Sequence, residues 1–241
     1  MRLKSLLALL FGLFFAGALA AQTPPAAALP IDPPAPTPDN ILHLDLSTGG
    51  RVTIQLRPDA APRHVERIKT LTRQGFYNGL LFHRVIEGFM AQTGDPTATG
   101  EGGSKLPDLA AEFNSLPHLR GMVSMARTND PNSANSQFFI MLAPRFSLDN
   151  KYTVFGRVTA GMNFVDAIEK GEPPANPTRI LQASIAADKK APPAPGQSFA
   201  TPSGAAPRAS GRGMAAGPAV PPPPSIRLPE AKPKAPPKKS R

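Results

Sequence analysis

Short runs of alternating hydrophobic and polar residues divide the middle of the chain into elements of strand length. Leu42, Leu44 and Leu46 alternate with polar residues, and after the turn at 47–50 the run 51–56 alternates again. This pattern predicts a β-hairpin with one apolar face. Six more apolar runs of strand length lie at 80–86, 89–93, 122–126, 137–142, 153–158 and 179–186.

Two other segments have the spacing of an amphipathic helix. The segment 62–74 begins with proline and is followed by Gly75, which are typical ends of a helix, and 161–169 has the same spacing over a shorter length. The apolar positions are Val65, Ile68 and Leu71 in the first segment and Met162, Val165 and Ile168 in the second. Eight short strands and two helices predict a mainly β fold. Alternation alone allows either a closed eight-stranded antiparallel β-barrel or a sandwich.

The N-terminus has the pattern of an export signal. Arg2 and Lys4 precede an apolar run, 6–19, which ends at the small-residue site Ala18-Leu19-Ala20. We therefore expect 1–20 to be a signal peptide that is cleaved after Ala20 and directs the protein to the periplasm. A buried helix or a membrane anchor is the alternative, but the run is shorter than the roughly 20 residues of a membrane span.

Proline marks the limits of the folded part. Of the 31 prolines, seven fall in 22–38 and fourteen in 186–241. We predict an Ala/Pro-rich linker over 21–38 and a disordered Pro/Ala/Lys-rich tail over 187–241. One folded domain remains, at 39–186.

Charge is distributed in the same uneven way. The net charge of +10 comes from the two ends, because residues 21–185 carry fifteen charges of each sign. A neutral domain lacks the basic surface of a nucleic-acid-binding fold. We interpret the basic tail as a solubilising end, with contact to anionic surfaces as the alternative. Without heptad repeats, the chain is expected to be a monomer.

Several kinds of chemistry are excluded or left unsupported by the residue types. The absence of cysteine excludes disulfides, thiolate catalysis and cysteine-based metal sites. The four histidines lack metal-ligand spacing, and the glycine-rich run 100–105 has the wrong order for a phosphate loop and is interpreted as a surface turn. The sequence therefore predicts no metal site and no cofactor.

Two segments concentrate aromatic and polar residues. Residues 82–95 read FHRVIEGFMAQTGD, and residues 132–140 read NSANSQFFI. Strand alternation would place Phe82 and Arg84 on one face, and Met90 and Gln92 on one face with Phe89 pointing the other way. The ordinary interpretation is a hairpin with a paired arginine and core aromatics, and we expect Phe82, Phe138 and Ile140 to lie in the core.

Together with LDNKYTVFG at 148–156, these segments resemble the cyclophilin-type peptidyl-prolyl cis-trans isomerases in order and spacing over about 41–186. The resemblance implies a closed eight-stranded antiparallel β-barrel capped by two α-helices, and so favours the barrel over the sandwich. It also implies catalysis of X–Pro isomerisation on unfolded or extended proline-containing polypeptides, without a cofactor. Together with the export signal, this predicts a role in the folding of exported proteins.

The same resemblance implies a role for each site residue. Arg84 is expected to donate a hydrogen bond to the proline nitrogen, and Gln92 to bind the substrate backbone. The backbone of 126–128, including Ala126, is expected to bind the residue before proline, with His83 in support. The apolar pocket is expected to contain Phe89, Met90, Phe139 and Leu148, with Tyr152 at its rim.

Two alternatives use the same fold without this catalysis. One is a non-catalytic peptide-binding or holdase module with the same groove, and the other is a small-molecule-binding barrel, which would need an open apolar mouth. The sequence also departs from the family at three places. The segment between Met125 and Pro131 is one residue longer, Ala134 replaces a usual Asn, and Ser147 occupies a position where animal members carry Trp.

The Ser147 position generates a first prediction. Cyclosporin-type inhibitors are expected to bind this chain weakly, because the aromatic contact of the animal proteins is missing, whereas catalysis need not suffer. Inhibition of isomerase activity over a cyclosporin titration checks this. An inhibition constant in the nanomolar range would contradict it.

Overall fold

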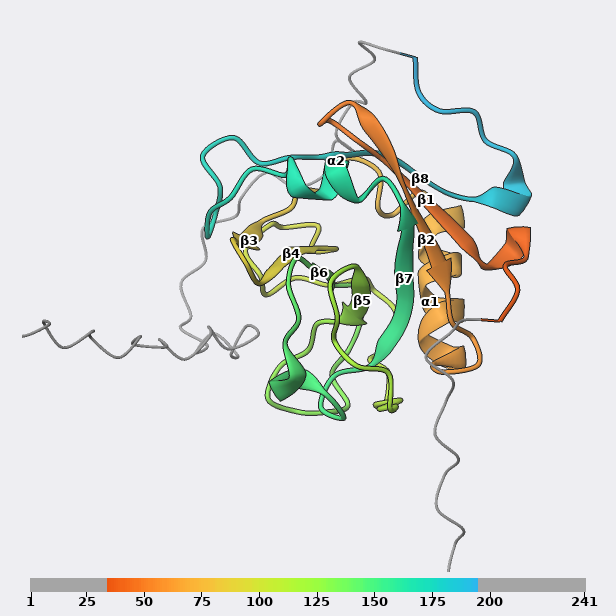
Figure 1. Cartoon of the computed structure of the whole chain (residues 1–241), viewed down its shortest axis with the longest axis vertical. Helices are drawn as coiled ribbons and strands as arrows, with labels where there is room; N and C mark the ends of the chain where they lie inside the picture. Colours follow the sequence, from red (N-terminus) through yellow and green to blue (C-terminus); the bar gives the residue numbers. More distant parts are fainter. Residues whose placement is uncertain (1–33, 195–241) are drawn as a thin grey trace, which may run out of the picture.

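The computed structural model of the chain describes residues 34–194 (Figure 1). The predicted signal peptide, most of the predicted linker and nearly all of the predicted tail lie outside the described residues. Within them, the elements run from Pro38 to Asp188. No helix in this part of the chain is long and apolar enough to cross a membrane.

Eight strands of the described region form one antiparallel sheet in the order β3-β4-β6-β5-β7-β2-β1-β8. The strands are β1 (Ile41–Leu46), β2 (Gly50–Leu56), β3 (Arg84–Ile86), β4 (Met90–Thr93), β5 (Met122–Met125), β6 (Phe138–Met141), β7 (Val154–Ala160) and β8 (Ile180–Ile185). The helices are α1 (Pro62–Arg73) and α2 (Met162–Asp166), with three short 3-10 helices, η1 (Pro38–Asn40), η2 (Phe146–Leu148) and η3 (Ala186–Asp188). The predictions of eight strands and two helices are confirmed.

The sheet curls, but its two end strands do not pair with each other as regular strands. Strands β3 and β8 are its two ends, and the chain just before each is joined by a single bridge between Leu81 and Arg179. The N–H of Phe82 donates to the carbonyl of Thr178 nearby, at 2.9 Å. The prediction of a closed barrel is therefore not confirmed, and the sheet is a curled half-barrel. The physical reason is that regular pairing in the predicted strand 80–86 begins only at Arg84.

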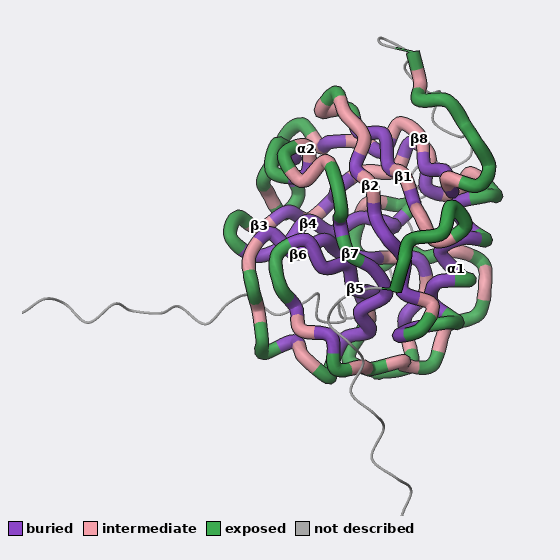
Figure 2. Tube along the Cα trace, turned by 45° about the vertical axis from the view of Figure 1, so that its right-hand side comes forward, coloured by how far each residue is buried: buried purple, intermediate pink, exposed green. Residues whose placement is uncertain are grey.

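Strand alternation divides the sheet between two environments. Val85, Ala91, Ile140 and Val123 pair in register across β3, β4, β6 and β5, and all four are buried in the main core. Phe82, Phe138 and Ile140 lie in this core, as predicted. Helix α1 packs against β8 and α2 against β2 (Figure 1). Figure 2 shows the buried residues following the strands while exposed residues follow the connections.

Helix α1 is capped by a distant carboxylate. Its N-cap residue, Ala61, has no side-chain acceptor, and the backbone N–H groups of Arg63 and His64 donate instead to Glu112 at 3.2 and 3.1 Å. The His64 ring lies 2.6 Å from the same carboxylate. Burial opposes ionisation of Glu112, but these hydrogen bonds, led by that from the His64 ring, hold its pKa below the usual value. Glu112 therefore ties the long segment 94–121 to α1.

We expect Glu112→Ala to reduce the free energy of unfolding by about 2 kcal/mol, because it leaves two helix N–H groups and a buried imidazole without their acceptor. Urea denaturation measures this. Glu169→Ala is the matched control, since Glu169 is exposed and its carboxylate has no partner among residues 34–194. Equal stability of the two variants would rule out the capping role.

Candidate active site

One row of side chains crosses the face of the sheet that points away from the main core. Arg84 on β3 lies opposite Gln92 on β4, Gln92 lies opposite Phe139 on β6, and Phe139 lies opposite Ser124 on β5. Residues directly opposite each other in an antiparallel sheet project to the same face. The register therefore brings a cation, an amide and an aromatic ring into one row, although they are far apart in the sequence.

This row borders a second apolar cluster. The cluster includes the predicted pocket residues Phe89, Met90, Phe139 and Leu148, the predicted rim residue Tyr152 and Ala126 of the predicted backbone segment, together with Met122, Met141 and Val154. The ring centroids of Phe139 and Tyr152 are 5.8 Å apart in an edge-on arrangement. The structure thus places every predicted pocket residue in one cluster, separate from the main core.

Two orientations expected from simple alternation are wrong. Phe89 shares the cluster of Met90 rather than pointing the other way, because it lies in the turn after Gly88, whose φ is +65°, and β4 begins one residue later. Phe82 lies in the main core while Arg84 lies in the site row, because the chain before Arg84 is not a regular strand.

The Arg84 side chain is mostly buried and paired. Its Nε donates to the Glu172 carboxylate at 2.6 Å, and the two residues share a pocket of about 350 Å³ with His83, Ala98, Thr99 and Pro173. Burial lowers the pKa of His83, which favours a neutral ring at pH 7. Sequence reasoning missed Glu172. It follows Arg84 by 88 residues, and nothing in its local sequence signals the contact.

Gln92 is oriented by a second amide. Its Nε2 donates to Oε1 of Gln137 at 2.8 Å, and Nε2 of Gln137 donates to the carbonyls of Gly100 and Gly102. The N–H of Gly100 donates to the Asp95 carboxylate at 2.6 Å. The glycine-rich run is therefore a turn organised around a carboxylate, which fits the turn interpretation rather than a phosphate loop.

A buried histidine that sequence reasoning did not assign lies against the aromatic cluster. Nδ1 of His118 is 2.8 Å from the Asp149 carboxylate and Nε2 is 2.9 Å from Oγ of Ser124. Its ring stacks with Phe139, with 6.3 Å between centroids and 21° between planes. Burial lowers the pKa of His118 and keeps the ring neutral, so Nδ1–H donates to Asp149 and Nε2 accepts from the Ser124 hydroxyl. The only sequence signal was its position in the long segment 94–121.

The backbone beside the cluster offers one open position. The N–H of Ala126 donates to the Gln137 carbonyl at 2.9 Å, and the N–H of Thr128 donates to Oγ of Ser133. The backbone N–H and C=O of Arg127 have no partner within the described part of the chain. Of the predicted segment 126–128, Arg127 is therefore the residue able to pair with an added extended segment.

Comparison with known proteins identifies the family. The family model described as "Cyclophilin type peptidyl-prolyl cis-trans isomerase/CLD" matches residues 43–185, which include every element of the sheet except the first residues of β1. The chain belongs to the cyclophilin-type peptidyl-prolyl cis-trans isomerases. The first of the relatives, "Probable peptidyl-prolyl cis-trans isomerase" from Brucella suis, is 49% identical over 172 residues, covering 65% of this chain and 87% of the relative.

Solved cyclophilins have the same fold. Cyclophilin AquaCyp293 from Hirschia baltica aligns with a TM-score of 0.59 and 33% identity, over 64% of this chain and 76% of that one. A cyclophilin-type isomerase from Cryptosporidium parvum, solved in the presence of the dipeptide Ala-Pro, aligns with a TM-score of 0.57 and 28% identity, over 60% of this chain and 98% of that one.

The pH dependence of stability follows from the neutral state of His118. Its pKa in the folded cyclophilin domain is below the usual 6.5, so below pH 6.5 the unfolded chain binds a proton that the folded chain does not. The stabilisation is fully present above pH 6.5 and is lost as the pH falls toward the folded-state pKa. The pKa values of His43, His64 and His83 are also lowered by burial.

Urea denaturation at pH 7.5 and pH 5.5 isolates the His118 contribution. His118→Asn keeps an amide N–H for Asp149 but does not titrate. We expect the variant to lose less stability than the wild type between the two pH values. The difference should be at most about 1.4 kcal/mol, the free energy that corresponds to a tenfold change in proton affinity. The same loss in both proteins would show that His118 titrates equally in the folded and unfolded states.

Proposed function

We propose that this chain accelerates X–Pro isomerisation by donating a hydrogen bond from Arg84 to the proline nitrogen inside the apolar cluster. The observation that supports this most directly is the side-by-side placement of Arg84, Gln92 and Phe139 in one row of the sheet. A fixed cation beside a buried aromatic surface is the arrangement that the reaction requires.

The requirement comes from the electronic structure of the peptide bond. Resonance gives the bond a rotational barrier of about 20 kcal/mol. When the bond twists, the lone pair localises on the proline nitrogen, which then accepts a hydrogen bond that it cannot accept in the planar form. A donor held in place therefore stabilises the twisted state more than the planar states. Arginine suits this role because it stays charged and its guanidinium is rigid.

Other residues of the site would hold the substrate. Phe89, Met90 and Phe139 would contact the proline ring, and Gln92 would bind the substrate carbonyl near the twisting bond. The unpaired backbone of Arg127 would hold the residue before proline as an added extended strand. The Ala-Pro dipeptide of the Cryptosporidium structure supports proline-containing peptides as the substrate class.

The cellular setting is proposed from the sequence. The apolar run 6–19 and the small residues that end at Ala20 support export to the periplasm, where the clients would be folding proteins. The balanced charge of 21–185 supports polypeptide rather than nucleic-acid partners for the domain. Contact of the basic tail with anionic surfaces and a monomeric state remain predictions. No step of the proposed mechanism uses a cofactor.

A protease-coupled isomerisation assay on a short Xaa-Pro peptide tests the mechanism. Arg84→Ala is expected to lower kcat/KM by about 100-fold, the general effect of removing one preorganised donor. Arg84→Lys keeps the charge but loses the rigid guanidinium, so its kcat/KM should lie between those of the wild type and Arg84→Ala. Arg157→Ala is the control, because Arg157 is exposed on β7 and has no ion pair within residues 34–194.

The other outcomes separate the alternatives. Equal rates for the wild type and Arg84→Ala would mean that the pocket, rather than the cation, lowers the barrier. No catalysis in either, with peptide binding retained, would favour the holdase interpretation of the same groove. Thermal unfolding of each variant shows whether a lost rate reflects a lost fold.

A further inference from the structure

Arg127 lies over an aromatic residue of the cluster and is held there by neutral groups. Its guanidinium carbon is 4.5 Å from the centroid of the Tyr152 ring. Its Nε and one terminal nitrogen donate to the Lys151 carbonyl at 3.1 and 2.8 Å, and the other terminal nitrogen donates to the Thr128 carbonyl at 2.8 Å. The nitrogen that donates to Thr128 also makes a longer contact with the Asn129 carbonyl, at 3.5 Å. These acceptors fix the position of the charge without neutralising it, and one of the five N–H groups remains for another acceptor.

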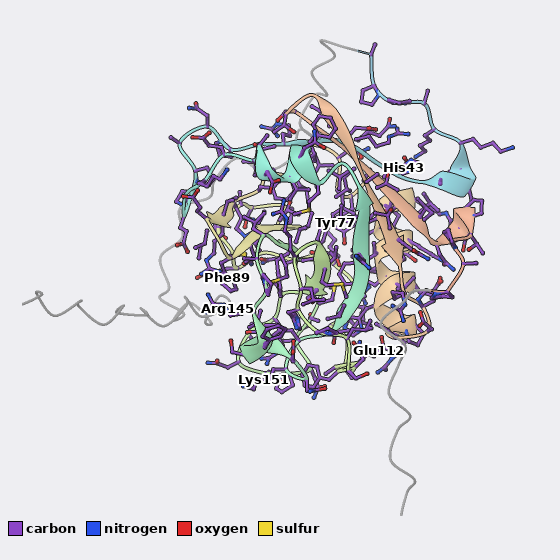
Figure 3. All side chains as sticks on the ribbon, viewed as in Figure 1. His43, Tyr77, Phe89, Glu112, Arg145 and Lys151 are labelled. Atoms are coloured by element: carbon purple, nitrogen blue, oxygen red, sulfur yellow. The ribbon has the colours of Figure 1, made fainter. Side chains whose placement is uncertain are left out.

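Arg145 has the same relation to a second aromatic residue. Its guanidinium carbon is 4.9 Å from the centroid of the Phe89 ring, and Figure 3 shows the two side chains next to each other. Its backbone N–H donates to the His118 carbonyl at 2.8 Å, which fixes the base of the side chain. The five N–H donors of its guanidinium have no acceptor among residues 34–194.

Only one of the three arginines beside the cluster forms an ion pair within residues 34–194. Arg84 is paired with Glu172, whereas neither Arg127 nor Arg145 has a carboxylate oxygen within 4.0 Å in the described part of the chain. The neighbouring acids Asp149 and Asp130 are already hydrogen-bonded, the first to His118 and the second to the N–H of Asn132, and Glu87 is exposed in the turn before Phe89. Arg127 and Arg145 thus lie on aromatic rings of the second apolar cluster with no ion pair among residues 34–194.

We infer that Arg127 and Arg145 make this groove select proline-containing segments that carry acidic residues next to the X–Pro bond. The inference rests on the proposed function, since it names the substrate class of the same groove. A fixed guanidinium loses little conformational freedom when it pairs with a carboxylate, and its planar donors match the two carboxylate oxygens. The backbone of Arg127 would hold the residue before proline, so its guanidinium lies close to the substrate residues on that side of the X–Pro bond. Arg145 would pair with an acidic residue at a second position.

A simpler role for the two arginines predicts a different result. A guanidinium on an aromatic face is attracted to the ring and covers it, whatever the substrate carries. If covering the rings were the whole role, peptides with acidic, neutral and basic flanking residues would react equally well. The charge dependence of catalysis therefore separates selection from packing.

The experiment is a scan of short Xaa-Pro peptides with the full chain. Glu, Gln or Lys is placed in turn at each of the two positions before proline and the two after it, and kcat/KM is measured at low and high salt. At the selected positions we expect kcat/KM to be about threefold to fivefold higher for the Glu peptide than for the Gln peptide, which is the effect of one partly exposed ion pair. The value for the Lys peptide should be lower than that for the Gln peptide. The preference should shrink in about 0.5 M salt, because the screening length shortens.

For each variant the readout is the Glu-to-Gln ratio, which is kcat/KM for the Glu peptide divided by kcat/KM for the Gln peptide. Arg127→Gln should reduce the Glu-to-Gln ratio at the positions before proline, and Arg145→Gln should reduce it at the second selected position. Arg127→Lys keeps the charge and should keep part of the ratio. Arg157→Gln removes a remote charge of the same sign and should leave every ratio unchanged. A general loss of folding lowers both rates together and does not move a ratio.

The failure of this inference can be told from the failure of the proposed function. Catalysis of all peptides at equal rates, or ratios that survive both glutamine variants, would overturn the acidic preference and leave the isomerase function intact. If no peptide is isomerised, the proposed function fails, and the same series in a fluorescence anisotropy binding assay decides the preference. Tighter binding of the Glu peptides would support it, and equal binding would reject it.

Discussion

The register between β3, β4, β6 and β5 is the constraint on which the site depends. With Arg84 opposite Gln92 and Gln92 opposite Phe139, the adjacent residues on each strand, Val85, Ala91 and Ile140, must enter the main core. A slip of one residue would exchange the two sets, burying a cation in the core and exposing its aliphatic residues. The free energy of burying the core therefore also fixes the geometry of the row that contains Arg84, Gln92 and Phe139.

Much of this arrangement could be predicted from local pattern. The hairpin β1–β2 and helix α1 follow from alternation and from helical spacing, because their apolar residues bury one face only. The family motifs predicted which side chains would gather around Phe139. What alternation could not supply was the position where regular pairing starts, since the short strand β3 begins at Arg84. The orientations of Phe82 and Phe89 depend on that position, and so does the open ladder.

The residues that orient the site side chains could not be predicted from the sequence either, but for a different reason. Glu172 and His118 reach Arg84 and Phe139 through contacts between distant segments, and no periodic pattern records such contacts. These partners matter because a preorganised donor is effective only when its position is already fixed before the substrate binds. A carboxylate on Arg84, an amide on Gln92 and a neutral imidazole behind Phe139 each restrict one member of the row.

The distribution of charge also bears on the proposed binding of unfolded chains at the second cluster. An apolar surface alone would bind any hydrophobic segment, and nothing in it would orient the bound chain. Cations held on the rings of Tyr152 and Phe89 leave the apolar surface in place and add a direction, because a carboxylate on the substrate can meet them in only a few registers. Because residues 21–185 carry no net charge, long-range attraction for anions is weak, and the proposed selection would act at close range, after the segment has reached the cluster.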